Sequence, residues 1–366
     1  MVSDRKQSAL FLIHSLATAG SQGLQAWEQG TFLASTRIQL APALKAAERI
    51  GLKPHIINLR SEDTHGLTQI GDPKLCIFGK LSHPDQDFAE RIAMANLAAI
   101  SILKQKKIPI YTTYCDNLAQ SKSPTISSLY RALLWHADVI ISPNKAMINH
   151  SREWHNPERV PKELIIEDPW QVERCPFTQL QANEPCRIIW FGHSSNSQYL
   201  LKELQSIFLE CSAWQSFELT ILSDPSTGKQ IKDAMKQARF RKPWSLRCIA
   251  WNSKQQPKQL REELIRAHIS LLPSDPNDPR KSAASHNRAV DSVQAGCITI
   301  ASPLPSYLEL RKILITTTSF PLSINAAIQQ RERLSLKWDQ LRESELNRFS
   351  PAENQKKWNS AFQALK

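Results

Sequence analysis

Residues 281–310 read KSAASHNRAVDSVQAGCITIASPLPSYLEL, and this stretch decides the fold. Apolar side chains recur at helical spacing, which predicts a helix over about 287–295 with one buried face. They are Ala289, Val290 and Val293. The candidate N-cap side chains are Ser282, Ser285 and Asn287. Gly296 is expected to end the helix, and CITIAS to form a strand buried on both faces.

Strand-like runs alternate with helical segments on both sides of this stretch. The predicted strands are SALFLIHSL, PHIINL, LCIFGK, IPIYTTYCD, DVIISPN and ELIIED in the first half, and CRIIWF, FELTILSD and HISLLPSD in the second. Helical patterns cover 85–104 and 127–137. This alternation favours an α/β fold with parallel sheets, and 366 residues with 41% apolar content suffice for two cores.

The predicted domain division follows from composition. Residues 169–185 contain three prolines and little periodic structure, so a linker is placed at 171–185. We expect one Rossmann-like domain over 1–170 and a second over 186–320. Polar helices over 321–366 are expected to pack back across the domains.

The polar edge of the helix over 287–295 carries both an acid and a base. Asn287, Arg288 and Asp291 are three or four residues apart and therefore share one helical surface. A carboxylate accepts both hydroxyls of a ribose, while a guanidinium and the N–H groups at a helix start favour a diphosphate. This combination suits a nucleotide-sugar. The alternative is a solvated helix face with an ion pair between Arg288 and Asp291.

The same stretch resembles the donor-binding signature of group 1, family 4-like GT-B glycosyltransferases. In that family, a helix with an acidic residue leads into an alanine-glycine turn, a strand and a serine-containing loop. Asp291, five residues before Gly296, matches the family's ribose-associated glutamate. The family's other glutamate, eight residues earlier, is Ala283 here, beside Lys281 and Ser282. The resemblance implies two Rossmann-like domains facing each other across a cleft, with C-terminal helices.

A glycine loop follows the predicted strand CRIIWF. Gly192 lets backbone N–H groups approach a phosphate closely, and His193 is expected to touch the donor's phosphate or sugar. The family often has a basic residue after this loop, whereas this chain has SSN at 194–196. Phosphate contacts are therefore expected from Arg288, Lys281 or Arg280. The alternative is a glycine needed only for the turn.

Two residues after first-half strands are candidates for catalysis. His14 follows the first strand, where inverting enzymes of the resembled family often carry a general base. Asp116 ends the strand IPIYTTYCD, and its carboxylate is expected to orient an acceptor hydroxyl. The alternatives are a polar histidine at a strand end and an Asp-Asn pair that caps the next segment.

Other acceptor-side candidates lie in neighbouring loops, since open α/β sheets bind ligands at the carboxyl ends of their strands. Arg37 lies in LASTRIQLAP, which resembles a polar turn of the family in which an arginine faces the cleft. Asn117 follows Asp116. Glu167 and Asp168 end another strand and are expected to cap it, pair across domains or face the cleft.

The net charge of +12 predicts a surface that attracts phosphates, anionic lipids or polyanionic glycans. Peripheral contact with an anionic membrane is one reading of the basic clusters 104–107 and 241–247; a merely solvated surface is the other. No nucleic-acid motif is present, so no nucleic-acid partner is expected.

Targeting and redox features favour a cytoplasmic protein, with membrane contact only at the inner face. Residues 3–20 loosely match a signal peptide, but His14 interrupts the apolar run and cleavage would remove a predicted strand. No apolar run reaches the roughly 20 residues of a membrane span. Seven cysteines without CxxC pairs predict reduced, buried thiols.

The leading hypothesis is a hexosyltransferase that moves a sugar from a nucleotide-sugar to a glycan, a lipid-linked saccharide or a small molecule, as in polysaccharide biosynthesis. The nucleotide-sugar is a substrate, and no cofactor is expected. We predict no metal, because the prolines around Asp275 and Asp278 favour a loop over a metal site. A catalytically lapsed GT-B protein that binds sugar or nucleotide is the main alternative, supported by Ala283. Another two-Rossmann enzyme, such as a sugar-nucleotide epimerase, is the third.

Overall fold

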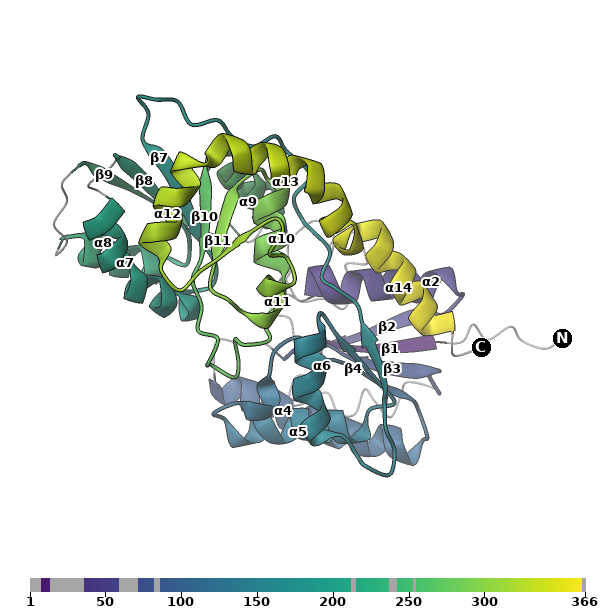
Figure 1. Ribbon diagram of the computed structural model, residues 1–366. Coiled ribbons are helices and arrows are strands. Elements are labelled where there is room, and N and C mark those ends of the chain that lie inside the picture. The colour runs from purple at the N-terminus through teal and green to yellow at the C-terminus, as the bar shows by residue number, and fades with distance from the viewer. Residues whose placement is uncertain are drawn as a thin grey trace. The chain divides into compact units, whose positions relative to one another are not determined.

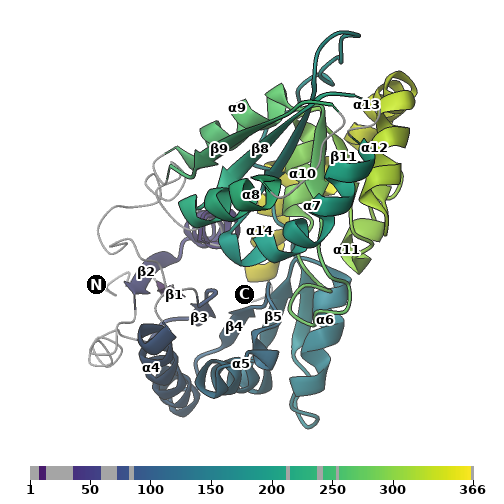
Figure 2. The same ribbon diagram turned by 90° about the vertical axis from the view of Figure 1, so that its left-hand side faces the viewer.

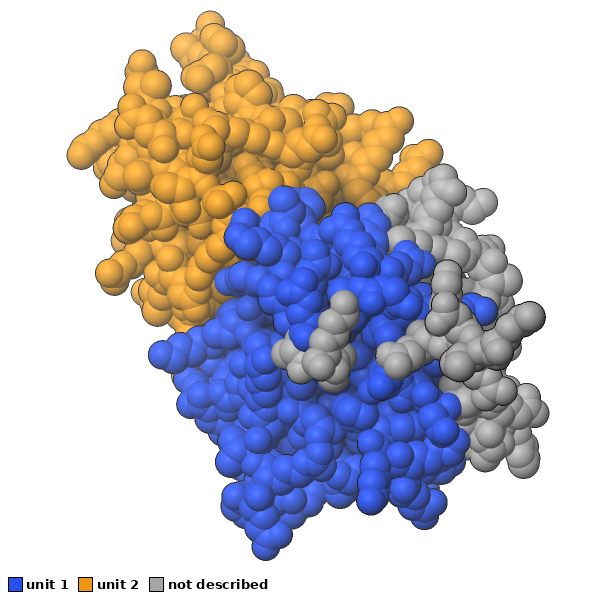
Figure 3. Space-filling model, turned by 90° about the vertical axis from the view of Figure 1, so that its right-hand side faces the viewer, with its two compact units in different colours: residues 1–169, 283–285, 351–366 blue, residues 170–282, 286–350 orange. Residues whose placement is uncertain are grey.

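A computed structural model gives the structure of the chain. It describes residues 8–13, 36–58, 72–81, 86–211, 215–236, 242–252 and 255–363. The chain forms two compact units (Figure 3). The first contains residues 1–169, 283–285 and 351–366, and the second contains residues 170–282 and 286–350.

The first unit is built on a parallel sheet of six strands in the order β2-β1-β3-β4-β5-β6 (Figure 1). The strands are β1 (Ser8–Ile13), β2 (Lys53–Asn58), β3 (Leu75–Phe78), β4 (Ile110–Thr113), β5 (Val139–Ser142) and β6 (Lys162–Ile165). All six were predicted from apolar runs, and the structure confirms them. Successive side chains of β1 point to opposite faces: Leu10 and Leu12 enter one core cluster, Ala9 and Phe11 the other.

Helices cover both faces of this sheet. They are η2 (Thr36–Leu40), α2 (Ala41–Arg49), α4 (Gln86–Gln105), η3 (Leu118–Gln120), α5 (Pro124–His136), α6 (Lys145–Ser151), η4 (Arg152–Trp154) and α14 (Pro351–Gln363). Helices α4 and α5 pack together over one core cluster, and α2 and α14 over the other. Trp358 and Phe362 of α14 are fully buried, and the Phe362 ring lies 6.0 Å from that of Tyr111. The last helix is therefore part of the first unit's core.

The second unit has a parallel sheet in the order β12-β11-β10-β7-β8-β9. Its strands are β7 (Cys186–Phe191), β8 (Phe217–Ser223), β9 (Trp244–Ala250), β10 (Ile269–Leu272), β11 (Ile298–Ala301) and β12 (Ile315–Thr316). Successive connections run outward from β7 in one direction and from β10 in the other, so the topological switch point lies between these two neighbours. Ligands of open α/β sheets bind at such a point, beyond the carboxyl ends of the strands.

The helices of the second unit are η5 (Ser194–Asn196), α7 (Ser197–Cys211), α8 (Pro225–Lys236), α9 (Gln256–Arg266), α10 (Asn287–Gln294), α11 (Pro305–Leu308), α12 (Phe320–Gln329), α13 (Arg331–Leu346) and η6 (Asn347–Phe349). Helix α7 packs beside α8 and α12, as Figure 2 shows for α7 and α8. Helix α10 packs against β10, β11 and α13. The predicted helix over 287–295 is confirmed, and CITIAS contains β11.

The two ends of α10 are stabilised in different ways. Gly296 has φ 83°, and a Cβ at this position would lie 2.2 Å from the carbonyl oxygen of Pro176, so glycine is required. The fully buried guanidinium of Arg342 donates to the carbonyls of Val293 and Gln294 at the last turn. At the start, the N-cap residue is His286 and not the predicted Ser282, Ser285 or Asn287. The predicted N-caps were therefore wrong.

Three features of the second half of the chain could not be anticipated from the pattern. Residues 241–247 were interpreted as a basic cluster, but 244–250 form β9, an edge strand whose side chains are only partly covered. The helices after residue 320 do not all belong to one unit: α12 and α13 belong to the second unit and α14 to the first. The predicted linker 171–185 is packed within the second unit.

Within the described ranges, no helix combines the length and the apolar character needed to cross a membrane. The seven cysteines are all free thiols, and every one except Cys248 is buried, as predicted.

Candidate functional site

Gly192 and Arg288 come together at the switch point of the second unit. Gly192 follows β7 directly, and Arg288 lies in the first turn of α10. Nη1 of Arg288 is 3.5 Å from the carbonyl oxygen of Phe191, and a Cβ on Gly192 would lie 3.4 Å from the same nitrogen. Gly192 has φ 156°, which is rare for residues with a side chain. The backbone conformation, rather than the space beside Arg288, therefore favours glycine at this strand end.

The loop after Gly192 uses its own N–H groups for local structure. The N–H of Ser194 donates to Asp224, that of Ser195 to the ring of His193, and that of Asn196 to the carbonyl of His193. The His193 side chain is exposed and caps η5. In this arrangement the cation of Arg288, rather than the loop amides, is the group at this strand end best suited to meet a phosphate.

The polar loop between β10 and α10 is organised by Asp278. Its carbonyl accepts from the N–H groups of Lys281 and Ser282, and its carboxylate accepts from the hydroxyl of Tyr199 at 2.6 Å and from Arg280. Burial alone would raise the pKa of Asp278, but these hydrogen bonds lower it to about 2. Asp278 thus stabilises the loop between β10 and α10. The sequence had predicted a loop around Asp275 and Asp278.

Asp291 is not on a solvated helix face. It is 1% exposed, and its two carboxylate oxygens accept from the backbone N–H of Gln171 at 2.7 Å and from Nε2 of Gln171 at 3.1 Å. The surface ion pair with Arg288 was therefore the wrong alternative. The carboxylate instead receives two donors side by side, which is the pattern that two ribose hydroxyls would supply. Its predicted role with the donor stays a prediction, as do those of the other predicted donor residues.

The remaining donor candidate in α10 is Asn287, whose Oδ1 accepts from the N–H of Arg288 at 2.7 Å. This bond holds the backbone of Arg288 at the helix start. The Arg288 side chain is directed to the end of β7. Asn287 and Arg288 are therefore joined in the first turn of α10, whereas Asp291, predicted to share a polar surface with them, is buried.

In the first unit, Asp116 forms an ion pair with Lys80, which follows β3. Both side chains are 28% exposed. Burial would lower the pKa of Lys80, but the Asp116 carboxylate raises it above its usual range. Burial, and then the Asp116 charge, raise the pKa of the neighbouring Cys115 thiol to about 12. Sequence analysis missed Lys80, although Gly-Lys directly after the strand LCIF places a cation at the carboxyl edge of the sheet.

The other acceptor-side candidates have different surroundings. Asn117 is 1% exposed, and its Oδ1 accepts from the hydroxyl of Tyr114 at 2.5 Å, so it holds the loop after β4. Arg37 lies in η2 and is half-buried. His14 lies outside the described residues, so its predicted role as a base stays a prediction.

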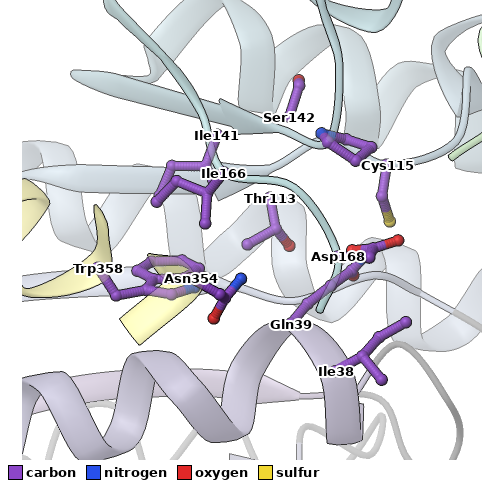
Figure 4. Close-up of a pocket in the computed structure, with 11 residues that line it drawn as sticks. Ile38, Gln39, Thr113, Cys115, Ile141, Ser142, Ile166, Asp168, Asn354 and Trp358 are labelled. Atoms are coloured by element: carbon purple, nitrogen blue, oxygen red, sulfur yellow. The ribbon is translucent and has the colours of Figure 1, made fainter. Parts of the chain in front are cut away.

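A small pocket lies at the carboxyl ends of β4, β5 and β6 (Figure 4). Its volume is about 10 Å³, enough for roughly one water molecule. Asp168 is 4% exposed there and accepts from Nε2 of Gln39 at 3.1 Å and from the hydroxyl of Ser285. Glu167 binds Lys357. Both acids after β6 therefore have partners within the first unit, and the pocket is too small for a sugar.

No protein-family model and no curated protein sequence matches the chain. Among solved structures, HepE of Anabaena in complex with UDP-glucose matches with a TM-score of 0.64 at 10% identity, covering 98% of this chain and 99% of that chain. The chain has the GT-B fold.

Other GT-B structures agree. A glycosyltransferase from Rickettsia africae matches with a TM-score of 0.56 at 13% identity, covering 99% of both chains. The lipopolysaccharide outer core galactosyltransferase WaaB matches at 0.55 and 12% identity, covering 98% of this chain and 99% of that chain. The predicted fold class is therefore confirmed. Membership of the family 4-like group within GT-B stays a prediction.

Proposed function

We propose that this GT-B chain is a glycosyltransferase that moves a hexosyl group from a nucleotide-sugar to a glycan, lipid-linked or small-molecule acceptor. The contact between Arg288 and the Phe191–Gly192 strand end carries the proposal. It provides a cation, together with the N-terminus of α10, at the switch point between β7 and β10. A similar fold in HepE, whose solved complexes contain UDP and UDP-glucose, supports a uridine nucleotide as the first donor to test.

The reaction follows from these charges. The acceptor hydroxyl attacks the anomeric carbon of the donor sugar, the bond from that carbon to the diphosphate oxygen breaks, and the hydroxyl proton passes to a base. The leaving diphosphate gains negative charge, which Arg288 and the N-terminus of α10 stabilise. We assign proton acceptance or acceptor orientation to Asp116, after β4, and to His14, which lies outside the described residues.

The ribose is assigned to Asp291. Its carboxylate is 1% exposed and accepts two adjacent donors from Gln171. Donor binding through Asp291 then requires the ribose hydroxyls to share or replace those two bonds. A donor that lacks the 2′-hydroxyl is expected to bind more weakly for this reason.

The deciding experiment is a screen of UDP-, GDP- and dTDP-sugars for transfer and for donor hydrolysis. It compares the intact protein with Arg288→Ala, Asp291→Ala and, as a control, Arg333→Ala on the exposed face of α13. Loss of turnover in the first two variants alone supports the assignment. Turnover that survives both substitutions would remove Arg288 and Asp291 from the site.

A catalytically lapsed GT-B protein is the second candidate, and one observation favours it. Ala283, where the resembled family has its other glutamate, is fully buried in the first unit's core, and its carbonyl accepts from Asn144. Nucleotide binding without turnover for every donor and acceptor would support this alternative.

Metal independence, a cytoplasmic location and peripheral contact with anionic membranes belong to the same proposal. Activity that persists in excess EDTA tests the first. Co-sedimentation with vesicles containing anionic lipid, compared with neutral vesicles, tests the last. A peripheral contact predicts binding that weakens as salt is raised.

A further inference from the structure

His286, the residue before α10, forms a buried pair that the proposed function does not use. Its side chain is 2% exposed, its Nε2 lies 3.1 Å from Oε2 of Glu309, and Arg348 donates to the same carboxylate oxygen at 2.8 Å. The Phe349 ring packs on the imidazole at 4.9 Å between centroids. These contacts fix the ring at the entrance to the helix.

The pair also fixes which nitrogen carries a proton. A carboxylate only accepts, so Nε2 of His286 must carry the hydrogen that faces Glu309. Burial would raise the pKa of Glu309, but hydrogen bonds from His286 and Arg348 hold it below its ordinary value, so this acid stays ionised. A neutral His286 therefore presents a lone pair at Nδ1.

That second nitrogen is buried, and no group in the described part of the chain forms a hydrogen bond with it. Leaving a buried polar atom unpaired costs about 1–3 kcal/mol. Because Nδ1 is only two bonds from Cβ, it stays near the backbone of the N-cap residue. The ring makes no capping bond to the N–H groups of α10, as far as the described atoms show. Nδ1 is thus a buried acceptor at the helix start whose hydrogen-bonding capacity is unused within the described residues.

We propose that His286 is a proton-linked diphosphate ligand: it binds a phosphate oxygen through Nδ1–H as the imidazolium, while Nε2–H stays on Glu309. This inference rests on the proposed function, because it places the nucleotide's diphosphate at the start of α10. A phosphate oxygen only accepts near neutral pH, so Nδ1 must gain a proton when it binds. The charged groups facing His286 are Glu309, which favours the imidazolium, and Arg348, which opposes it from beyond the carboxylate.

The consequence is that nucleotide binding takes up a proton. Isothermal titration calorimetry of UDP binding, repeated in buffers of different ionisation enthalpy, measures the number of protons taken up. For the intact protein we expect an uptake that approaches one proton as the pH is raised, and an affinity that falls over the same range by up to about tenfold per pH unit. His286→Gln keeps a donor for Glu309 but cannot be protonated, so its proton uptake is expected to vanish.

Two further variants make the result specific. His150→Gln, on the partly exposed surface of α6, is expected to retain the uptake. Glu309→Gln removes the carboxylate that stabilises the imidazolium without touching the ligand, so the pH at which affinity falls should move downward. Thermal melting of each variant identifies any that fail to fold. If His286→Gln does not fold, the pH dependence of Glu309→Gln provides the test.

The outcomes separate the two proposals. Uptake that persists in His286→Gln or disappears in His150→Gln overturns the role of His286. UDP binding without proton uptake by the intact protein also overturns it, and indicates a hydroxyl donating to neutral Nδ1. Absence of UDP binding at every pH would instead contradict a UDP-sugar donor site and this inference with it.

Discussion

Both carboxylate oxygens of Asp291 accept hydrogen bonds from one residue, Gln171, whose backbone and side chain each supply a donor. The pair joins the first residues of the second unit to the middle of α10. Asp291 therefore stabilises the second unit and is also proposed to bind the ribose. Its substitution affects both the stability of the protein and donor binding, and these must be measured separately.

Asp291→Asn is expected to lower the free energy of unfolding by about 1–3 kcal/mol, because one oxygen becomes an N–H₂ group facing a donor of Gln171. Urea unfolding measures this. Gln171→Ala removes the Nε2 donor from the buried carboxylate and keeps the backbone N–H, so a loss in the same range is expected. Unchanged unfolding free energies in both variants would show that the pair contributes nothing to stability.

Gly192→Ala is expected to destabilise the protein and weaken UDP binding at least tenfold. The added methyl meets Arg288 at 3.4 Å, and the backbone has φ 156°. Strain of this kind costs about 1–3 kcal/mol. Gly51→Ala, with φ 84° and no described atom within 4 Å of the added Cβ, reports the conformational cost alone. If Gly51→Ala also weakened UDP binding, the contact with Arg288 would not be the cause.

Asp116→Asn is expected to reduce sugar transfer by about 10²-fold or more if Asp116 takes part in proton transfer. UDP affinity should not change, because Asp116 belongs to the acceptor side. Its half-exposed ion pair with Lys80 contributes at most about 1 kcal/mol to stability. Lys80→Met breaks the same ion pair from the other side, so transfer rates reduced equally in both variants would assign Asp116 a structural role only.

The unfolding free energy should fall as the pH drops from about 7 toward 4, because of His268. Burial, and then the charges of Arg187 and Arg331, lower the pKa of His268 to about 4. The unfolded chain, with a histidine pKa near 6.5, therefore binds a proton that the folded state excludes, at up to about 1.4 kcal/mol per pH unit.

Urea unfolding at about pH 7 and pH 5 tests this. His268→Gln should be less stable than the intact protein at the higher pH but should lose less on acidification. His150→Gln, on the partly exposed surface of α6, should keep the full dependence. An unchanged slope in His268→Gln would assign the acid sensitivity to other groups.

Prediction from the sequence succeeded where local pattern determines structure. Apolar runs such as those around Ile77 and Ile300 are buried on both faces of parallel sheets, and Gly296 stands where only glycine fits. The helix spacing also placed Arg288 correctly in the first turn of α10. These features depend on residues close together in the chain.

Other features depend on partners that are distant in sequence. Nothing near Asp291 indicates that residue 171 supplies its donors, and nothing near Asp116 indicates a cation 36 residues earlier at Lys80. The edge strand β9 was missed because an edge position tolerates the arginine and serine that interrupt its apolar pattern. Contacts of this kind require the three-dimensional arrangement.

Helix α14 has a consequence for how the protein is made. Trp358 and Phe362 complete one of the two core layers around the first sheet, yet they are synthesised only after all of residues 170–350. During synthesis, the apolar surface that α14 covers in the first unit therefore stays uncovered by this helix while residues 170–350 are made. Translation must therefore reach α14 before this core layer of the first unit can be completed.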